Sequence, residues 1–191
     1  VGVLGSEGRE GDFLMGFEES YGYLAGTSVR DKDAVVASML ICELAAHWKK
    51  LGLDLYEAME RLYETYGFWS SALLGQAYEG PEGASDMAAM MSGLRVHAPE
   101  RIGCTAVAER IDYAQGAPMP VVNPTDEPQH LPEADVLEFR LADGSRVLFR
   151  PSGTEPKAKA YVFAKGADRA ESEAKLAALV ADAKSILGGT R

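Results

Sequence analysis

"VLEFRLADGSRVLFR", residues 136–150, decides the fold of the second half of this chain. Two extended runs rich in branched and aromatic residues flank Asp143-Gly144, a dipeptide suited to the tight turn of a β-hairpin. The stretch therefore predicts two antiparallel strands joined at that turn.

The remainder of the second half predicts one antiparallel sheet with helices on one face. Residues 105–114 and 158–164 are typical of further strands, and residues 79–95 are typical of a helix with Pro81 near its first turn. Residues 116–134 form a long proline-rich connection without periodicity. An antiparallel sheet with helices packed on one face belongs to the α+β class.

The chain ends in an amphipathic helix. Asp168 is placed to cap its first turn, and Glu171, three residues later, can complete a capping box. The predicted buried side consists of apolar residues at helical spacing, namely Leu176, Leu179, Val180, Ala183 and Leu187.

The first half predicts a strand, a loop and two helices. Residues 12–20 have the short apolar run of a buried strand, and the glycines in residues 22–30 continue it as a loop. A helix capped by Asp31 or Asp33 follows, and a second helix covers about residues 54–66. The composition changes after this second helix, which predicts a domain boundary near residues 67–72.

Composition and charge exclude several classes of partner. The formal net charge is −10, from 29 Asp and Glu against 19 Lys and Arg, so no nucleic-acid partner is expected because the long-range field would repel phosphodiesters. No apolar run reaches the roughly 18 residues that cross a bilayer, and no signal peptide is recognisable, so we expect no membrane and a cytoplasmic location.

The cysteines and histidines predict no metal site. Cys42 and Cys104 stand alone in apolar contexts without metal-ligand spacing, which predicts two buried thiols rather than a disulfide. The histidines, His47, His97 and His130, are scattered and have no paired carboxylates at ligand spacing.

The stretch "FRPSGTEPKAKAY", residues 149–161, concentrates donors between two predicted strands. The stretch contains cations, hydroxyls and a glycine, and this glycine is expected to permit backbone angles that other residues avoid. Together these residues would form a pocket for a phosphate monoester. The predicted pocket residues are Arg150, Ser152, Gly153, Thr154, Lys157 and Lys159. The alternative is a polar loop whose lysines form a solvated edge. The spacing of a Walker loop is absent, which disfavours ATP.

Residues 16–22, "GFEESYG", place Glu18, Glu19 and Ser20 between glycines after a predicted strand. Carboxylates and a hydroxyl suit neighbouring sugar hydroxyls, whereas the alternative is an acidic surface turn. Lys32 is expected in the first turn of the following helix, where a cation opposes the macrodipole unless acidic neighbours or a bound phosphate compensate it.

These two motifs carry a resemblance to a known family. "GFEESYGYLAGTSVRDKDAV", residues 16–35, and "RPSGTEPKAKAY", residues 150–161, resemble the α-D-phosphohexomutases, in the bacterial phosphoglucomutase and phosphomannomutase branch related to phosphopentomutases. The resemblance implies an α/β plus α+β chain. Residues 1–68 would be the C-terminal remainder of an α/β third domain, and residues 69–191 a TBP-like α+β fourth domain.

The resemblance also implies roles for individual residues. Glu18 and Ser20 would bind hydroxyls of a phosphosugar, and Lys32 would approach the reacting end as a possible assisting residue. The phosphate loop of the family corresponds to Arg150, Ser152, Gly153 and Thr154. A later basic residue, usually arginine in the family, corresponds to Lys159.

Two further motifs of the family are absent from this sequence. Neither the "T-A-S-H-N-P" type loop with its phosphorylatable serine nor the "D-G-D-x-D-R" magnesium loop occurs. The chain is therefore expected to be the C-terminal part of a longer enzyme and inactive alone, with the remaining domains of the same polypeptide as its partner.

By resemblance, the complete enzyme would interconvert hexose 1-phosphate and hexose 6-phosphate, with glucose the first expectation. It would use a phosphoserine, Mg²⁺ held by the missing part, and glucose 1,6-bisphosphate as intermediate and activator. Two alternatives are a standalone, non-catalytic phosphosugar-binding module and a purely structural association domain.

Overall fold

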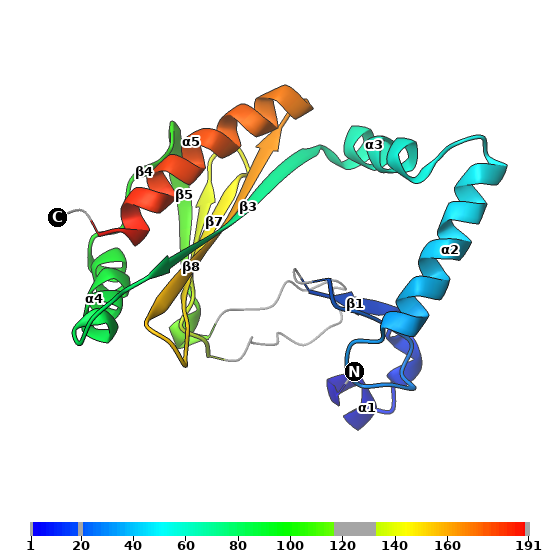
Figure 1. Cartoon of the computed structure of the whole chain (residues 1–191), viewed down its shortest axis with the longest axis horizontal. Coiled ribbons are helices and arrows are strands. Elements are labelled where there is room, and N and C mark those ends of the chain that lie inside the picture. Colours follow the sequence, from blue (N-terminus) through cyan, green and yellow to red (C-terminus); the bar gives the residue numbers. More distant parts are fainter. Residues whose placement is uncertain (1, 19–20, 117–132, 190–191) are drawn as a thin grey trace. The chain divides into compact units, whose positions relative to one another are not determined.

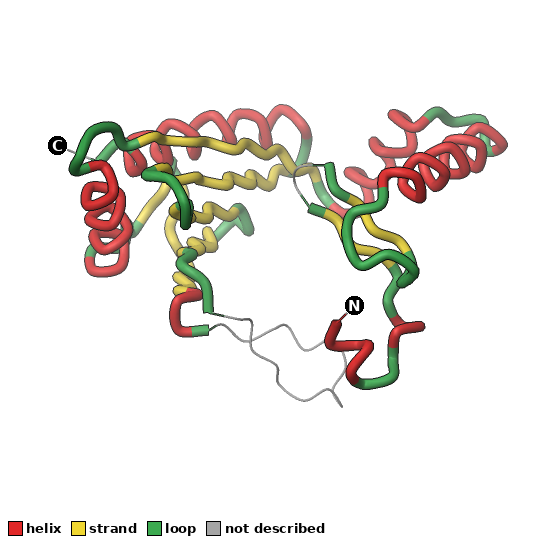
Figure 2. Tube along the Cα trace, turned by 60° about the horizontal axis from the view of Figure 1, so that its bottom comes forward, coloured by secondary structure: helices red, strands yellow, loops and turns green. Residues whose placement is uncertain are grey.

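The computed structural model of this chain describes residues 2–18, 21–116 and 133–189. The chain divides into two compact units, unit 1 with residues Val1–Leu62 and unit 2 with residues Tyr63–Arg191 (Figures 1 and 2). Glu19 and Ser20 lie outside the described residues, as does most of the predicted connection over 116–134.

Unit 1 begins with short elements and continues with helices. In chain order the elements are α1 (Gly2–Ser6), η1 (Glu10–Asp12), β1 (Met15–Phe17), β2 (Tyr23–Ala25), α2 (Ala34–Lys50) and α3 (Leu55–Tyr66), whose residues from Tyr63 onward fall in unit 2. Strands β1 and β2 pair antiparallel, with Phe17 opposite Tyr23. A strand within residues 12–20 and the two helices are confirmed, but the predicted burial of this strand is wrong, because Met15 and Phe17 are exposed. The prediction of a loop over residues 22–30 is wrong at β2, because Tyr23–Ala25 form a short strand that pairs with β1.

The start of α2 is fixed by Asp33. Its carboxylate accepts hydrogen bonds from the amides of Val35 and Val36 at 3.0 and 3.1 Å, so Asp33 rather than Asp31 is the cap. The expectation that Lys32 occupies the first turn is wrong, because the helix begins at Ala34. The Lys32 ammonium is instead compensated by its neighbour Asp31, 3.0 Å away.

Unit 2 is a six-stranded antiparallel sheet with two helices. Its elements are β3 (Phe68–Ala77), α4 (Gly83–Val96), β4 (Arg101–Ile102), β5 (Thr105–Asp112), η2 (Tyr113–Gln115), β6 (Leu137–Leu141), β7 (Arg146–Pro151), β8 (Lys157–Gly166) and α5 (Arg169–Leu187). The strand order is β3-β8-β7-β6-β5-β4. The four strands and two helices predicted for this half are confirmed. Strand β3 was not predicted.

The hairpin at residues 136–150 forms as its sequence predicts. Gly144 has a φ of +85°, the left-handed conformation that glycine adopts without strain. The Leu141 amide donates to the Ser145 carbonyl at 2.9 Å, which closes the turn between β6 and β7. Asp143 accepts a 3.0 Å hydrogen bond from the Ser145 amide and pairs with Lys175 of α5 at 3.1 Å. The turn is thereby fixed to the first half of α5.

Helices α4 and α5 cover one face of this sheet and form the core with it (Figure 1). Phe139 and Phe149 pack edge to face with ring centroids 6.0 Å apart, and both side chains are fully buried. The predicted buried side of α5 is confirmed: three of its residues are buried and two are partly buried against the core, namely Leu179, Ala183, Leu187, Leu176 and Val180.

The cap of α5 follows the prediction with one change. The Glu171 amide donates to the Asp168 carboxylate at 2.8 Å, as expected. The Glu171 carboxylate accepts its 2.6 Å hydrogen bond from the amide of Ala167, one residue before the cap, rather than from Asp168. Both side chains nevertheless satisfy backbone donors at the start of the helix.

The opposite face of the sheet, called here the open face, carries cationic side chains. Successive residues of a strand point to opposite faces, and β8 alternates strictly between buried small residues and half-buried or exposed larger ones. The strand register places six cations of β6, β7 and β8 on the open face, namely Arg140, Arg146, Arg150, Lys157, Lys159 and Lys165. This concentration of positive charge contrasts with the net charge of −10 for the whole chain.

The prediction of two buried thiols is wrong. Cys42 and Cys104 are both exposed. Cys42 lies on α2, which has no buried residue among those the structure describes, and Cys104 lies in the turn between β4 and β5. An apolar sequence context predicts burial only where another element covers the residue.

Asp143 predicts a loss of stability in acid. Burial alone would raise the pKa of its carboxyl, but hydrogen bonds from the Ser145 amide and the Lys175 ammonium hold that pKa below its ordinary value. A carboxyl whose pKa falls on folding adds stability that is present above its unfolded pKa and is lost as pH falls through its folded pKa. Unit 2 should therefore lose thermal stability below about pH 4, and Asp143→Asn should lose less over the same range.

Circular dichroism melts of both proteins between neutral pH and about pH 2 test this expectation. Equal losses of melting temperature in the wild type and in Asp143→Asn would show that this carboxylate has no part in the acid dependence.

Candidate functional site

The connection between β7 and β8 presents the predicted phosphate-binding residues. Arg150 lies directly opposite Lys159 in the register of these strands, so the two side chains are neighbours on the open face. Lys157 and Lys159 also share this face, as predicted from their spacing. The Ser152 amide donates to the Lys157 carbonyl at 2.7 Å and closes the loop.

The cations of this loop differ in their partners from Arg140 and Arg146, two other cations of the open face. Within residues 2–18, 21–116 and 133–189, no ion pair involves Arg150, Lys157 or Lys159. Arg140 and Arg146, by contrast, both lie near the Glu138 carboxylate, at 3.2 and 3.8 Å. Because a cation without an internal partner is available to an external anion, the loop end of the sheet is the candidate phosphate site.

The tip of the loop is open. No heavy atom lies within 4 Å of the position that a Cβ atom would take on Gly153. The expectation that Gly153 adopts a backbone conformation closed to other residues is wrong, since it is not among the glycines with positive φ. The Thr154 amide lies 3.4 Å from the Ser152 hydroxyl oxygen, a long hydrogen bond that a ligand could replace.

Gly75 on β3 leaves room for a neighbouring lysine. It lies opposite Lys159, and a Cβ atom there would come within 3.2 Å of Lys157 Cε. The aliphatic stem of Lys157 therefore passes over Gly75 toward β3. Lys157 thus borders the Arg150–Lys159 pair from the side of β3.

A buried carboxylate lies beside Arg140 and Arg146, and it was not predicted from the sequence. Glu138 on β6 is 2% exposed and accepts a 2.6 Å hydrogen bond from the Tyr113 hydroxyl. Burial raises the pKa of Tyr113, as does the adjacent Glu138 carboxylate. Arg146 also lies over the rings of Trp69 and Phe163, at 5.9 and 5.5 Å from their centroids.

The alternation of the hairpin could have placed Glu138 on the same face as Arg140, two residues later. It could not have shown that Tyr113, from outside the hairpin, covers the carboxylate.

In unit 1 the structure brings two of the predicted sugar-site residues together. Glu18 and Lys32 both approach Gly22, which lies in the loop between β1 and β2. The Asp33 amide donates to the Tyr23 carbonyl at 2.8 Å and attaches the segment before α2 to the hairpin. Asp31 chiefly, and Glu18 at longer range, raise the pKa of Lys32. Its side chain is therefore a cation at neutral pH.

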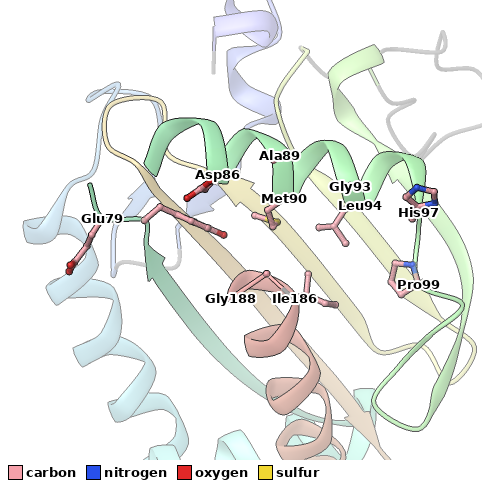
Figure 3. A pocket seen from close by; sticks show the side chains of 12 residues that line it. Glu79, Asp86, Ala89, Met90, Gly93, Leu94, His97, Pro99, Ile186 and Gly188 are labelled. Atoms are coloured by element: carbon pink, nitrogen blue, oxygen red, sulfur yellow. The ribbon is translucent and has the colours of Figure 1, made fainter. Parts of the chain in front are cut away.

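A hollow of unit 2 lies on the helix-covered side of the sheet, away from these residues. It is an open groove of about 820 Å³ between α4 and the end of α5. Met90 and Leu94 point toward Ile186 across it, with Asp86 near one end and His97 near the other (Figure 3). None of the predicted site residues lines it.

The donor set for a divalent cation is poor in the described parts of the chain. No group of three or more His, Cys, Asp and Glu side chains there is arranged to hold a metal ion. Asp31 and Asp33 are already engaged, with the Lys32 ammonium and with the first amides of α2. These residues do not fit the Mg²⁺ that the family resemblance implies.

Across the same described segments, no helix combines the length and the apolar character that a membrane crossing requires.

Comparisons with curated and solved proteins agree with one another. The chain is 36% identical over 154 residues to a phosphoglucomutase of Staphylococcus aureus, covering 81% of this chain and 28% of the relative. It is 33% identical over 181 residues to a probable phosphomannomutase of Haemophilus influenzae, covering 94% of this chain and 34% of the relative. The chain thus spans about a third or less of the length of these relatives.

A solved structure has the same fold. The crystal structure of the exocytosis-sensitive phosphoprotein pp63/parafusin, a phosphoglucomutase from Paramecium, in its open form, matches 98% of this chain and 31% of its own with a TM-score of 0.63. Sequence identity is 20%, so this likeness concerns the fold alone.

Two family models match consecutive parts of the chain. "Phosphoglucomutase/phosphomannomutase, alpha/beta/alpha domain III" matches residues 3–66, and "Phosphoglucomutase/phosphomannomutase, C-terminal domain" matches residues 94–186. The predicted α/β plus α+β class and the predicted family are confirmed. The chain belongs to the phosphoglucomutase/phosphomannomutase family, of which it carries domain III sequence followed by the C-terminal domain.

Proposed function

We propose that this chain is the C-terminal part of a phosphosugar mutase that interconverts hexose 1-phosphate and hexose 6-phosphate. Residues 1–68 would contribute the end of domain III and residues 69–191 the fourth domain. The observation that carries the proposal is the pair Arg150 and Lys159, adjacent on the open face and without an ion-pair partner among the described residues.

In this proposal the loop between β7 and β8 holds the phosphate that does not react. Arg150 offers the planar fork of donors that matches phosphate oxygens, and Lys159 offers a point charge beside it. The Ser152 and Thr154 hydroxyls, the Gly153 amide and the Lys157 ammonium would complete the donor set. Fixing one phosphate leaves the other end of the sugar free to be positioned for transfer, and positioning supplies much of the acceleration in phosphoryl transfer.

Glu18 and Ser20 would orient the sugar ring through its hydroxyl groups. A carboxylate accepts hydrogen bonds from two neighbouring hydroxyls, so either orientation of the ring can satisfy it. Lys32, kept protonated by Asp31, would neutralise charge near the phosphoryl group that is transferred. As an ammonium it can donate a proton but cannot accept one.

Other parts of the reaction would come from the rest of the polypeptide. We assign to it the phosphoserine and the Mg²⁺ site, and we take glucose 1,6-bisphosphate as the intermediate and activator. The exposed apolar surface of α2 supports a longer polypeptide, since five of its large apolar residues are at least 40% exposed, namely Val35, Met39, Leu40, Ile41 and Leu44. The remainder of domain III would cover them.

Nuclear magnetic resonance of the ¹⁵N-labelled chain tests the proposal. Titration with glucose 1-phosphate should shift the amide signals of Gly153 and Thr154, and glucose without phosphate should leave them in place. Inorganic phosphate should shift the same amides, because the anchor recognises the ester group itself. Loop signals that stay unchanged at millimolar glucose 1-phosphate would overturn the proposal.

A further inference from the structure

We infer that Gly22 is a positioning residue of the sugar-binding loop, because only a residue without a side chain allows Glu18 and Lys32 to meet there. This inference rests on the proposed function insofar as these two side chains contact the ligand. Nothing in the two sequence motifs assigns a role to this glycine.

The space around Gly22 is already filled by the two side chains. A Cβ atom on Gly22 would lie 2.3 Å from Lys32 Cδ, 2.6 Å from Glu18 Oε1 and 2.7 Å from Glu18 Cγ. All three distances are shorter than a van der Waals contact between heavy atoms. Gly22 is buried, although Tyr21 and Tyr23 on either side of it are exposed. The two site side chains therefore pass directly over its Cα atom.

Backbone conformation does not explain a glycine at this position. Gly22 is not among the residues with positive φ, whereas its neighbour Tyr21 has a φ of +62°. Tyr21 thus occupies the left-handed conformation that a glycine would adopt without strain. Gly22 occupies a conformation that does not require a glycine. Space for Glu18 and Lys32 is the remaining requirement.

The backbone of the hairpin holds Gly22 at this crossing. Its carbonyl accepts a 2.9 Å hydrogen bond from the Glu18 amide, and the Tyr23 carbonyl accepts one of 2.8 Å from the Asp33 amide. The first bond fixes Glu18 to one side of Gly22. The second fixes the segment that carries Lys32. The glycine thus lies between two anchored segments that are ten residues or more apart in the sequence.

The three atoms nearest to a methyl group at Gly22 are side-chain atoms. At Gly83 and Gly166, by contrast, an added Cβ would lie 2.1 Å from the Tyr78 carbonyl oxygen and 2.4 Å from the Ser172 amide nitrogen, which are backbone atoms. A methyl group at those two positions must disturb the fold. At Gly22 it can be accommodated by moving Glu18 and Lys32, so the fold is retained and the site geometry is lost.

Gly22→Ala tests the inference, with Gly16→Ala as its matched control. Gly16 lies in β1 of the same hairpin, and a Cβ atom there would be 3.7 Å from the Phe13 ring, an ordinary contact. Both variants should melt at the temperature of the wild type within a few degrees. Gly22→Ala should bind glucose 1-phosphate about tenfold more weakly, as expected when one charged hydrogen-bonding group is displaced. Gly16→Ala should bind it as the wild type does.

A second measurement does not depend on the sugar. Titration of ¹³C-labelled lysine side chains should give Lys32 a lower pKa in Gly22→Ala than in the wild type, because displacing the side chain separates its ammonium from the carboxylates that raise this pKa, Asp31 chiefly and Glu18 at longer range. A purely structural role for Gly22 would leave this pKa unchanged while lowering the melting temperature.

The outcomes separate the two ideas. If the wild type does not bind glucose 1-phosphate, the proposed function fails and the Lys32 titration still decides the role of Gly22. If the wild type binds and Gly22→Ala binds equally well, the inference fails and the proposed function stands. An unchanged Lys32 pKa in Gly22→Ala also overturns the inference.

Discussion

Replacing Arg150 with alanine is expected to weaken binding of glucose 1-phosphate by about 10- to 100-fold, the loss that follows removal of one charge-assisted donor group from a phosphate. The guanidinium is exposed at the end of β7, beside Lys159, and has no ion-pair partner among the described residues. Its removal should therefore leave folding nearly unchanged. Isothermal titration calorimetry at fixed ionic strength measures the affinity, and a melt verifies the fold.

Arg146→Ala is the control for charge. Arg146 lies four residues earlier on the same strand and the same face, but it is engaged with Glu138 and with the rings of Trp69 and Phe163. The Arg146→Ala substitution should lower the affinity for the phosphosugar less than threefold, because salt screens the effect of one distant positive charge. Equal losses in both variants would mean that the whole cationic face attracts the anion diffusely and that no site exists at Arg150.

Replacing Phe149 with alanine is expected to destabilise unit 2 by about 3–5 kcal/mol. Its ring is fully buried against Phe139, on the residue directly before Arg150. The substitution would remove apolar contacts and leave a cavity in the core between the sheet and the helices that cover it. A loss of this size is a large part of the total stability of a domain, so urea unfolding should show a much lower midpoint.

Leu148→Ala is the matched control for this prediction. Leu148 precedes Phe149 on β7 and points to the open face, where it is only half-buried. Its truncation should cost about 1 kcal/mol, because less apolar surface returns to water. If Leu148→Ala destabilises the unit as much as Phe149→Ala does, the open face must be covered like the other face, and the assignment of the two faces is wrong.

Elements with strong local signals were predictable from sequence. The hairpin over residues 136–150 has its turn chemistry and its alternation in one contiguous stretch, and α5 has its cap and its apolar stripe. Strand β3, which was not predicted, has weak local signals because Ser70, Ser71 and Gly75 interrupt its apolar pattern. Its conformation depends on the ten-residue register with β8 and on the hydrogen bond between the Ser70 and Ser172 hydroxyls.

The chemistry of the site was predictable only in part. The shared face of Lys157 and Lys159 follows from a two-residue spacing, and Arg150 follows from its place before a proline at the end of a strand. The convergence of Glu18 and Lys32 over Gly22 was not predictable, since it depends on how the hairpin and the start of α2 are joined. Contacts between segments distant in sequence leave no periodic signal.

We propose above that the loop between β7 and β8 binds the phosphate group of a phosphosugar. A crystal structure of the chain with glucose 1-phosphate tests it most directly. We expect the phosphate within hydrogen-bonding distance of the Arg150 guanidinium, with Lys159 beside it. A phosphate bound elsewhere, or an empty loop at saturating ligand with Arg150 turned toward solvent, would contradict it.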